Sequence, residues 1–374
     1  MHHPFTIMKL LWFLLLLGAF VVNTCNAKKY SREEGGEGGL HRSEEAASRQ
    51  LQSDPRTVKL KDPSYQPVTE QGYESTFPNE MKAKVQHDDY GENHEKHVNI
   101  GVIEELYQVV TIERLANIAR DYRKAYARAD PFPHIVIDGI FPRRFLEALS
   151  NEIPESKTQD GCYYRKCLTR DGHNKKSFVD SENDMGLYAR VFFGFLKSST
   201  WVKFLEQLSG IPNIIPDPHY HGSGLHITAS GGSLDIHADF NRHKKYQLDR
   251  RINTFVYLND DWPDSYGGHL ELWGRDMKSC YQKIVPAMGR LVVFSSTDFS
   301  YHGHPQPQTC PQNRFRRSIA LYYYTNGRPA EECLGGDCIG NNHSTLFQKP
   351  VGCKLCEEAT CKVYDETAPY WVDA

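Results

Sequence analysis

SLDIHADFN, residues 233–241, alternates polar and apolar side chains, which is typical of a β-strand with one face in the core. Successive side chains of a strand point to opposite faces, so His237 and Asp239 share one face. Asn241 continues that face and is expected to line a groove, whereas Phe240 is expected in the core. An imidazole and a carboxylate placed in this way can bind the same metal ion.

A second histidine completes the candidate ligand set. His302 follows RLVVFSS at residues 290–296, a predicted strand that can lie beside the first one in a barrel. Two imidazoles and one carboxylate on one face of a ferrous ion leave three positions open, as oxygen-activating non-haem iron enzymes require. His-x-Asp arises easily by chance in a chain with 17 His, so this prediction depends on the strands around it. His304 is an alternative ligand.

A basic residue leads another predicted strand, RFRRSIALYYYT at residues 314–325. By alternation, Arg316, Ser318 and Tyr322 share one face, and Arg317 lies on the other. A guanidinium binds a carboxylate through two parallel hydrogen bonds, which suits a dicarboxylate cosubstrate inside a barrel. We therefore expect Arg316, with Ser318 beside it, to hold a carboxylate. Arg317 stays open as the anchor, and both arginines are alternatively solvated charges at a strand edge.

Together these features resemble the 2-oxoglutarate and iron(II)-dependent oxygenase superfamily and, within it, the prolyl 4-hydroxylase-like branch. The resemblance covers about residues 131–329, and its matching elements are PFPHIVIDGIF, GGSLDIHADF, YGGHLELW, and HGHPQP followed by RRSIALYYYT. It implies that the metal ligands are His237, Asp239 and His302, and that Arg316 holds the far carboxylate of 2-oxoglutarate. The His-Gly step matches the family at His302, which is why we prefer it to His304.

The resemblance also implies an activity. Members of the family couple oxidative decarboxylation of 2-oxoglutarate, which gives succinate and carbon dioxide, to hydroxylation of an unactivated C–H bond. The implied cofactors are Fe(II), 2-oxoglutarate and L-ascorbate, with oxygen as the other reactant and a peptidyl proline of a secretory-pathway protein as the leading substrate. The same chemistry on another residue or on a small metabolite is an alternative, and so is a non-catalytic jelly-roll binding module.

The chain departs from the prolyl hydroxylase pattern at two places. Prolyl hydroxylases usually carry a Tyr nine residues before the first ligand, where this chain has Thr228. A Thr hydroxyl can still donate to a carboxylate, so Thr228 joins Arg316 and Ser318 as an expected cosubstrate-binding residue. The spacing from His302 to Arg316 is longer than usual and includes Cys310, which keeps the choice between the two arginines open.

The predicted fold class is α+β, with a double-stranded β-helix (jelly-roll) core and N-terminal supporting helices. Apolar residues recur at helical spacing in residues 103–129, 142–153 and 186–210. Residues 156–185 are polar and are expected to form a loop with a local Cys162–Cys167 disulfide. Short runs rich in β-branched and aromatic residues then predict the strands LHITAS, SLDIHADF, INTFVYLN, HLELWG, KIVPAM, RLVVFSS and SIALYYYT.

The N-terminus reads as a targeting signal. Lys9 precedes an apolar run that ends at Val22 and is too short for an ordinary spanning helix, and the small residues before Lys28 suit cleavage. We therefore expect a signal peptide at 1–27, with a signal anchor as the alternative, and a secretory-pathway location: endoplasmic reticulum or Golgi lumen, or secreted. A membrane is a partner only if the segment stays uncleaved.

The remaining organisation follows from composition. Residues 28–100 are polar and are expected to be a disordered linker or stem, residues 101–330 the oxygenase domain, and residues 331–374 a Cys-rich tail. The tail carries five of the ten cysteines, which an oxidising lumen favours as disulfides over a zinc or thiol-redox site. Asn342-His343-Ser344 is a glycosylation sequon. The net charge of −3 gives no reason to expect nucleic-acid binding.

Overall fold

The computed structural model describes residues 57–60, 99–153, 167–168, 173–349, 362–364 and 371–373. The expected signal sequence, nearly all of the expected stem, Cys162 and the three tail cysteines at 353, 356 and 361 lie outside the described residues. Within the described ranges no helix has both the length and the apolar character needed to span a bilayer.

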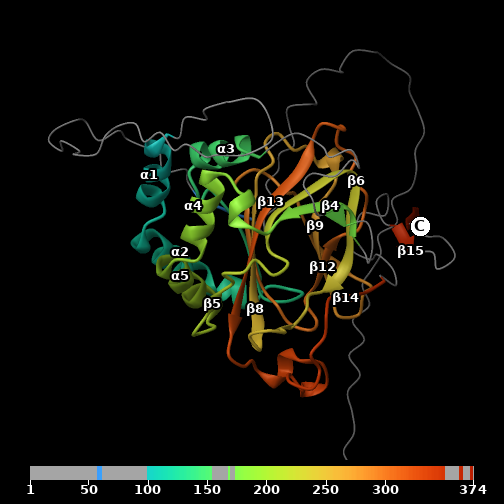
Figure 1. Ribbon diagram of the computed structural model, residues 1–374. Coiled ribbons are helices and arrows are strands. Elements are labelled where there is room, and N and C mark those ends of the chain that lie inside the picture. The colour runs from blue at the N-terminus through green and yellow to red at the C-terminus, as the bar shows by residue number, and fades with distance from the viewer. Residues whose placement is uncertain are drawn as a thin grey trace, which may run out of the picture. The chain divides into compact units, whose positions relative to one another are not determined.

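Five helices lie together on one side of the strands (Figure 1). They are α1 Ile100–Val109, α2 Ile112–Ala127, α3 Arg143–Asn151, α4 Leu187–Leu196 and α5 Ser199–Ser209. The Thr111 side chain accepts a hydrogen bond from the backbone N–H of Arg114 and so caps α2, and Ser198 caps α5 in the same way. Gly210 ends α5 in the left-handed conformation that favours glycine. The three predicted helical segments are thus helical in the structure.

The strands form one curled, hydrogen-bonded sheet in the order β1-β2-β11-β8-β13-β6-β12-β9-β10. Its main strands are β2 His134–Asp138, β4 His173–Val179, β6 Gly224–Ala238, β8 Leu248–Tyr257, β9 Leu270–Trp273, β10 Cys280–Ile284, β11 Leu291–Ser295, β12 Tyr301–His304 and β13 Phe315–Thr325. Short strands are β1 Thr57–Lys59, β3 Cys167–Leu168, β5 Ile215–Pro216, β7 Arg242–His243 and β14 Leu346–Phe347, and β15 Lys362–Tyr364 pairs separately with β16 Trp371–Asp373. Single 3-10 turns occupy Glu182–Asp184, Asp264–Tyr266, Ala330–Glu332 and Leu334–Gly336.

The long strand β6 organises the sheet. It pairs antiparallel with β13, β4, β12 and β14, so one continuous strand contributes to both sides of the curl. Figure 1 shows β13 crossing the middle of the strands, with the helices on one side of it and β6 on the other. The predicted jelly-roll core with N-terminal supporting helices is confirmed.

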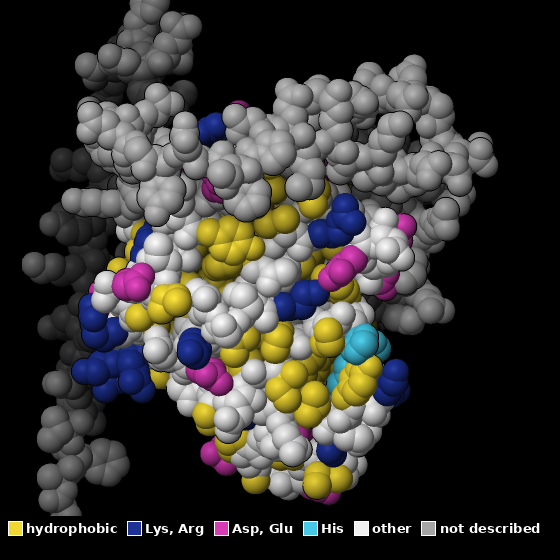
Figure 2. Space-filling model, turned by 60° about the vertical axis from the view of Figure 1, so that its left-hand side comes forward, with side chains coloured by type: hydrophobic (Ala, Val, Ile, Leu, Met, Phe, Trp, Pro, Cys, Tyr) yellow, Lys and Arg dark blue, Asp and Glu magenta, His cyan; other side chains and the backbone are white. Residues whose placement is uncertain are grey.

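Hydrophobic side chains fill two layers of this fold. The larger cluster lies between the helices and the sheet and includes Phe145, Phe192 and Trp201, all fully buried. A second cluster inside the curl includes Phe294 and Leu272. On the described part of the face in Figure 2, basic, acidic and hydrophobic side chains are interspersed, with no large area of one charge.

The expectation of a polar loop at 156–185 is wrong for part of its length. Residues 167–168 and 173–179 form β3 and β4, and β4 pairs with β6 along its length. Buried Ser177 and Val179 alternate with half-buried Lys176 and Phe178 in the structure, but the residues KSFV do not alternate in polarity, so the sequence did not indicate this strand. The side chains of the proposed Cys162–Cys167 pair lie outside the described residues. Within the tail, a disulfide joins Cys333 to Cys338.

Candidate metal and anion site

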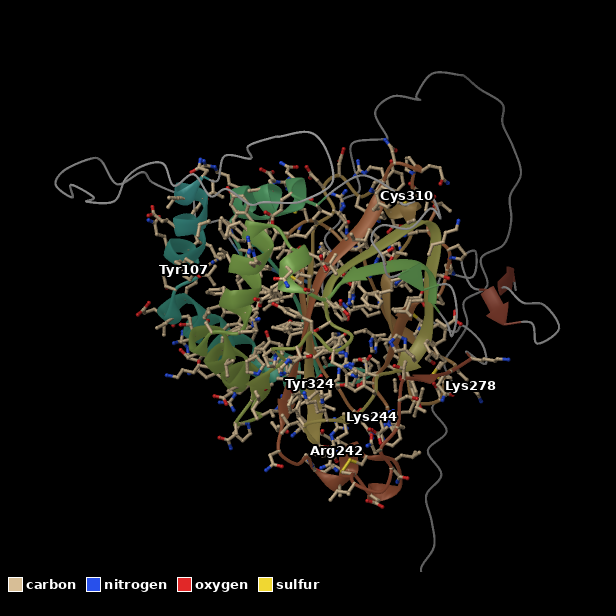
Figure 3. All side chains as sticks on the ribbon, viewed as in Figure 1. Tyr107, Arg242, Lys244, Lys278, Cys310 and Tyr324 are labelled. Carbon is tan, nitrogen blue, oxygen red and sulfur yellow. A yellow bond between two sulfur atoms is a disulfide. The ribbon has the colours of Figure 1, made fainter. Side chains whose placement is uncertain are left out.

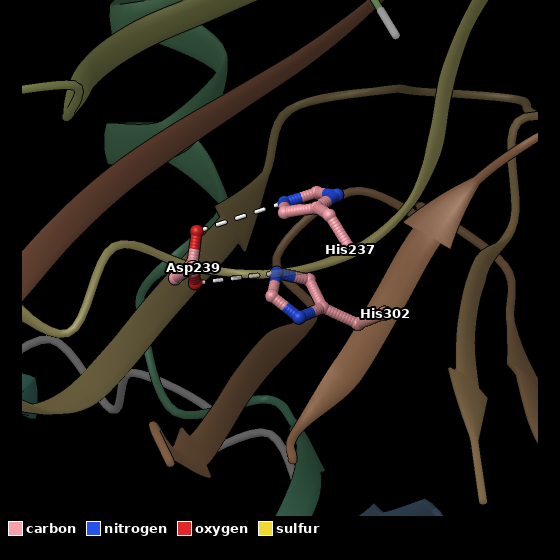
Figure 4. Close-up of side chains that lie close together, drawn as sticks. All are labelled: His237, Asp239 and His302. Atoms are coloured by element: carbon pink, nitrogen blue, oxygen red, sulfur yellow. Dashed lines mark ion pairs between the residues drawn. The ribbon is translucent and has the colours of Figure 1, made fainter. Parts of the chain in front are cut away.

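Three side chains converge inside the curl of the sheet (Figure 4). His237 lies near the end of β6 and is the direct cross-strand partner of His302 in β12, and Asp239 follows the end of β6. One ligand-capable atom from each residue lies within 4.8 Å of the others, and all three residues are buried. Of all His, Cys, Asp and Glu side chains in the described residues, these alone form such a group.

Each imidazole is held with one nitrogen toward the common point. His237 Nδ1 lies 2.7 Å from the Asp235 carbonyl oxygen, and His302 Nδ1 lies 2.8 Å from the Ser300 carbonyl oxygen. A carbonyl only accepts, so both Nδ1 atoms carry the proton and both Nε2 lone pairs are available to a metal. These Nε2 atoms lie 3.6 and 3.4 Å from the Asp239 carboxylate oxygens.

The Asp239 carboxylate is held ionised. Its Oδ2 accepts a hydrogen bond of 2.6 Å from Asn253 Nδ2 and lies 2.9 Å from a guanidinium nitrogen of Arg250. Burial alone would raise the pKa of Asp239, but the adjacent Arg250 guanidinium holds it well below its usual range. Burial lowers the pKa of His302 to about 4, which keeps that ring neutral. Two neutral imidazoles and one carboxylate fit a divalent iron.

A guanidinium lies in the same cavity. Arg316 is buried in β13, where its Nε donates to the Gly268 carbonyl oxygen at 2.7 Å and its Nη2 donates to the Tyr257 hydroxyl at 3.2 Å. The cavity that it lines also has the three candidate metal ligands in its wall. Gly268 has a φ of +69°, and a Cβ there would lie 3.0 Å from Arg316 Cδ. Position 268 therefore favours glycine, because any other side chain would crowd Arg316 in its observed position.

Of the two other expected cosubstrate residues, Ser318 lines the cavity and Thr228 lies directly beside Arg316. Thr228 in β6 is directly opposite Arg316, and Ser318, two residues further along β13, is directly opposite His226. Thr228 is fully buried, and its hydroxyl has no hydrogen-bond partner among the described residues. An unpartnered buried hydroxyl is uncommon in folded proteins and is explained if a ligand supplies the partner.

Arg317 lies on the opposite face of β13. Its Nη1 is 3.5 Å from the carbonyl oxygen of Ser150 in α3 and 3.4 Å from the Ser150 hydroxyl. The structure therefore brings Arg316, and not Arg317, into the cavity. His304 also lines the cavity wall, but it is not part of the three-residue ligand group.

The long segment between His302 and Arg316 packs against β6. Gln308 is fully buried and its Nε2 donates to the carbonyl oxygens of Thr228 and Ala229 at 2.8 and 2.7 Å. The Ser230 hydroxyl donates to the Cys310 carbonyl oxygen at 2.6 Å. Figure 3 shows Cys310 near one end of the sheet and Tyr324 of β13 toward the other. The inserted residues thus pack against β6 beside Thr228, and Arg316 lies directly opposite Thr228 despite the insertion.

Asn241 does not line an open groove, contrary to the expectation from alternation. Its Nδ2 donates to the Asn341 carbonyl oxygen at 2.8 Å, and its Oδ1 accepts from the His343 backbone N–H at 3.0 Å. The tail then pairs with β6 through β14, where Phe347 is opposite His237 and their ring centroids lie 5.4 Å apart. The tail thus packs against the strand and the ring of a candidate metal ligand.

Sequence reasoning missed several residues of this site. Arg250 and Asn253 of β8 hold Asp239. Asn253 stands in the predicted strand INTFVYLN and Arg250 lies just before it, and neither carries a motif of its own. Tyr257 is buried in the cavity wall, and its hydroxyl accepts a hydrogen bond from Arg316 that no sequence pattern indicated. Lys176 lines the cavity from β4, a strand whose polar composition had led us to expect a loop.

Comparison with known proteins places the site within a family model. Residues 223–324, which include the three candidate ligands and Arg316, match the model described as the 2OG-Fe(II) oxygenase superfamily. None of the curated proteins that were compared matches the chain.

Several solved structures resemble this one. A prolyl 4-hydroxylase from Phytophthora capsici is 16% identical over 58% of this chain and 68% of its own, with a TM-score of 0.40. A Trichoplax adhaerens prolyl hydroxylase, solved with a hypoxia inducible factor peptide, is 14% identical over 57% and 91%, with a TM-score of 0.38. HygX from Streptomyces hygroscopicus, solved with nickel and 2-oxoglutarate, is 12% identical over 61% and 96%, with a TM-score of 0.37.

Proposed function

Residues 223–324 make this chain a member of the 2OG-Fe(II) oxygenase superfamily, and from that premise we propose that it is a dioxygenase that hydroxylates a C–H bond. The observation that carries this proposal is the presence of two kinds of binding group in one cavity. A metal-ligating triad forms one part of its wall, and the buried guanidinium of Arg316 forms another. A 2-oxo dicarboxylate needs both, because it chelates a metal at one end and carries a carboxylate at the other.

The residues present fit the cofactors of that reaction. His237, Asp239 and His302 would hold Fe(II), and Arg316 with Tyr257 and Thr228 would bind the distal carboxylate of 2-oxoglutarate. When bound, these groups supply oxygen activation: 2-oxoglutarate is oxidised to succinate and carbon dioxide, and the second atom of O₂ enters the C–H bond as hydroxyl.

The protein's own contribution is placement. The carbonyl oxygens of Asp235 and Ser300 fix which nitrogen of each histidine faces the metal, and Arg250 keeps the carboxylate charged. The ligand side chains are almost fully buried, so few water molecules compete for them. A reactive centre in such surroundings is protected from side reactions with solvent.

For the substrate, we propose a peptidyl proline in a secretory-pathway protein, with L-ascorbate keeping the iron reduced. This rests on the prolyl 4-hydroxylase-like motifs and on the apolar N-terminal run that reads as a secretory signal. The endoplasmic reticulum or Golgi lumen, or the secreted fraction, is the corresponding location. The tail disulfide between Cys333 and Cys338 suits an oxidising compartment.

The test is turnover of the full chain with Fe(II), ascorbate and labelled 2-oxoglutarate. We expect labelled succinate to accumulate, and its rate to rise several-fold with proline-containing peptides that gain one oxygen atom. A rise with free metabolites or with other residues, and not with proline peptides, keeps the dioxygenase and replaces its substrate. No succinate under any condition, from a folded protein that binds iron, would favour a non-catalytic binding module and contradict the proposal.

A further inference from the structure

Lys176 stands in a row with two of the expected cosubstrate residues. In the pairing of β4 with β6, Lys176 is directly opposite Thr228, and in the pairing of β6 with β13, Thr228 is directly opposite Arg316. Directly opposite residues of neighbouring strands present their side chains on the same face, with Cβ atoms about 5 Å apart. All three side chains therefore lie on the cavity side of the sheet, where Lys176 and Arg316 both line the wall.

An interruption in the strand pairing precedes Lys176. The register of β4 against β6 shifts between Asn174 and Lys176, and the residue in between, Lys175, has a φ of +48°. The side-chain alternation along β4 therefore restarts at Lys176. Lys175 is exposed and its ammonium group donates to the Ser230 carbonyl oxygen at 3.3 Å. Of two consecutive lysines, one thus points outward and the other into the cavity.

No described acidic group neutralises Lys176. It has no hydrogen bond or ion pair among the residues that the structure describes, and Asp239, the carboxylate of the same cavity, is already held by Arg250 and Asn253. Burial and the charge of Arg316 lower the pKa of Lys176 to about 8. Two cationic side chains that share a partly desolvated cavity repel one another, and a bound dianion relieves that repulsion.

We propose that Lys176 is a cosubstrate-binding residue, which forms with Arg316 and Thr228 a two-cation subsite for the distal carboxylate of 2-oxoglutarate. The inference deepens the proposed function and rests on it. It also explains the departure at Thr228: a threonine is too short to replace a tyrosine by itself, and the lysine on the neighbouring strand supplies the missing donor. A carboxylate has about four acceptor positions, enough for Arg316, Lys176 and the Thr228 hydroxyl together.

The test compares ligand affinity in Lys176→Met with affinity in Lys175→Met, the adjacent exposed lysine. Titration calorimetry on the full chain, loaded with Fe(II) without oxygen, measures binding independently of turnover. We expect Lys176→Met to weaken 2-oxoglutarate binding about 10- to 100-fold, the loss of one charge-assisted contact. Lys175→Met should stay within about twofold of the wild-type protein, and Lys176→Arg should recover part of the loss.

A second ligand shows which carboxylate Lys176 binds. 2-Oxobutyrate keeps the metal-chelating end of 2-oxoglutarate and lacks the distal carboxylate, so its affinity should be equal in the wild-type and Lys176→Met proteins. Unchanged 2-oxoglutarate affinity in Lys176→Met, or an equal loss for both ligands, would overturn the inference and leave the proposed function standing. A folded, iron-loaded wild-type protein that binds no 2-oxoglutarate would overturn both. Circular dichroism checks that each variant is folded.

Discussion

The cavity has a metal end, formed by His237, Asp239 and His302, and an anion end, formed by Arg316, Thr228 and Lys176. The two ends share strand β6 but differ in how many of their polar groups have hydrogen-bond partners within the protein. At the metal end, both histidine Nδ1 atoms bind carbonyl oxygens, and Asp239 is held by Arg250 and Asn253. At the anion end, no described group hydrogen-bonds to the Thr228 hydroxyl, and the cationic side chains of Lys176 and Arg316 line the same cavity. The protein's own groups thus hold the metal ligands in place, whereas the residues of the anion subsite keep donors that a ligand can use.

This contrast predicts different responses to substitution. A residue of the metal end acts with the others as a unit, so its loss should remove metal and activity together. A residue of the anion end contributes one contact among several, so its loss should weaken 2-oxoglutarate binding by degrees and leave the metal in place.

The largest effect is expected for His237→Ala. Two remaining ligands hold a divalent metal poorly, so we expect bound iron to fall well below one per chain and succinate formation to drop at least about 1,000-fold. Metal analysis of the purified protein and the labelled 2-oxoglutarate assay measure the two quantities. Full turnover in a variant with wild-type circular dichroism would show that His237 is not a ligand.

Replacement of the buried arginine comes next. Arg316→Met should raise the KM for 2-oxoglutarate about 100-fold or more, because a bidentate charge-assisted contact is lost, and should leave iron content unchanged. Arg317→Met is the matched control, because its guanidinium faces Ser150 of α3 and not the cavity. Similar KM values for the two variants would contradict the assignment of Arg316, and not Arg317, as the residue that binds 2-oxoglutarate.

Asn253→Ala tests whether the metal end depends on residues behind the ligands. It removes the 2.6 Å hydrogen bond to Asp239 Oδ2, and we expect metal affinity to fall about 10- to 100-fold, as is usual for a partner of a metal ligand. Competition with a metal-binding dye gives the affinity. The 2-oxoglutarate affinity measured at saturating metal should stay near the wild-type value, and a selective loss there would contradict the division of the cavity.

The smallest effect is a pH dependence at the anion end. The pKa of Lys176 is lowered to about 8 by burial and by Arg316, with Asp239 and Arg250 as the other charged groups that act on it. The ammonium form is therefore present below about pH 8 and is lost as pH rises. We expect 2-oxoglutarate affinity to fall about tenfold from pH 7 to pH 9 in the wild-type protein. In Lys176→Met the same pH change should have little effect on 2-oxoglutarate affinity. An equally steep pH profile in this variant would show that a group other than Lys176 causes the pH dependence.

The sequence was most informative where one strand carries the chemistry. The face shared by His237 and Asp239, and the opposite faces of Arg316 and Arg317, follow from the period of two along a strand, and the structure has the same arrangement. His302 could be found because it follows a strongly apolar strand, although its pairing with His237 could not be read from the chain.

The sequence could not predict the orientation of a side chain that depends on strand register, or a contact between residues far apart in the chain. Lys176 faces the cavity directly after an irregular step in the pairing of β4 with β6, and a one-residue shift would have turned it outward. Asn241 binds tail residues about a hundred positions away, a contact that no local pattern encodes.

The most direct measurement is a crystal structure of the full chain grown without oxygen in the presence of Fe(II) and 2-oxoglutarate. We predict an anomalous iron peak within bonding distance of His237, Asp239 and His302, and a 2-oxoglutarate molecule whose distal carboxylate contacts Arg316. Iron bound elsewhere, or a 2-oxoglutarate molecule that does not reach from the metal to the guanidinium, would contradict the assignment of this cavity.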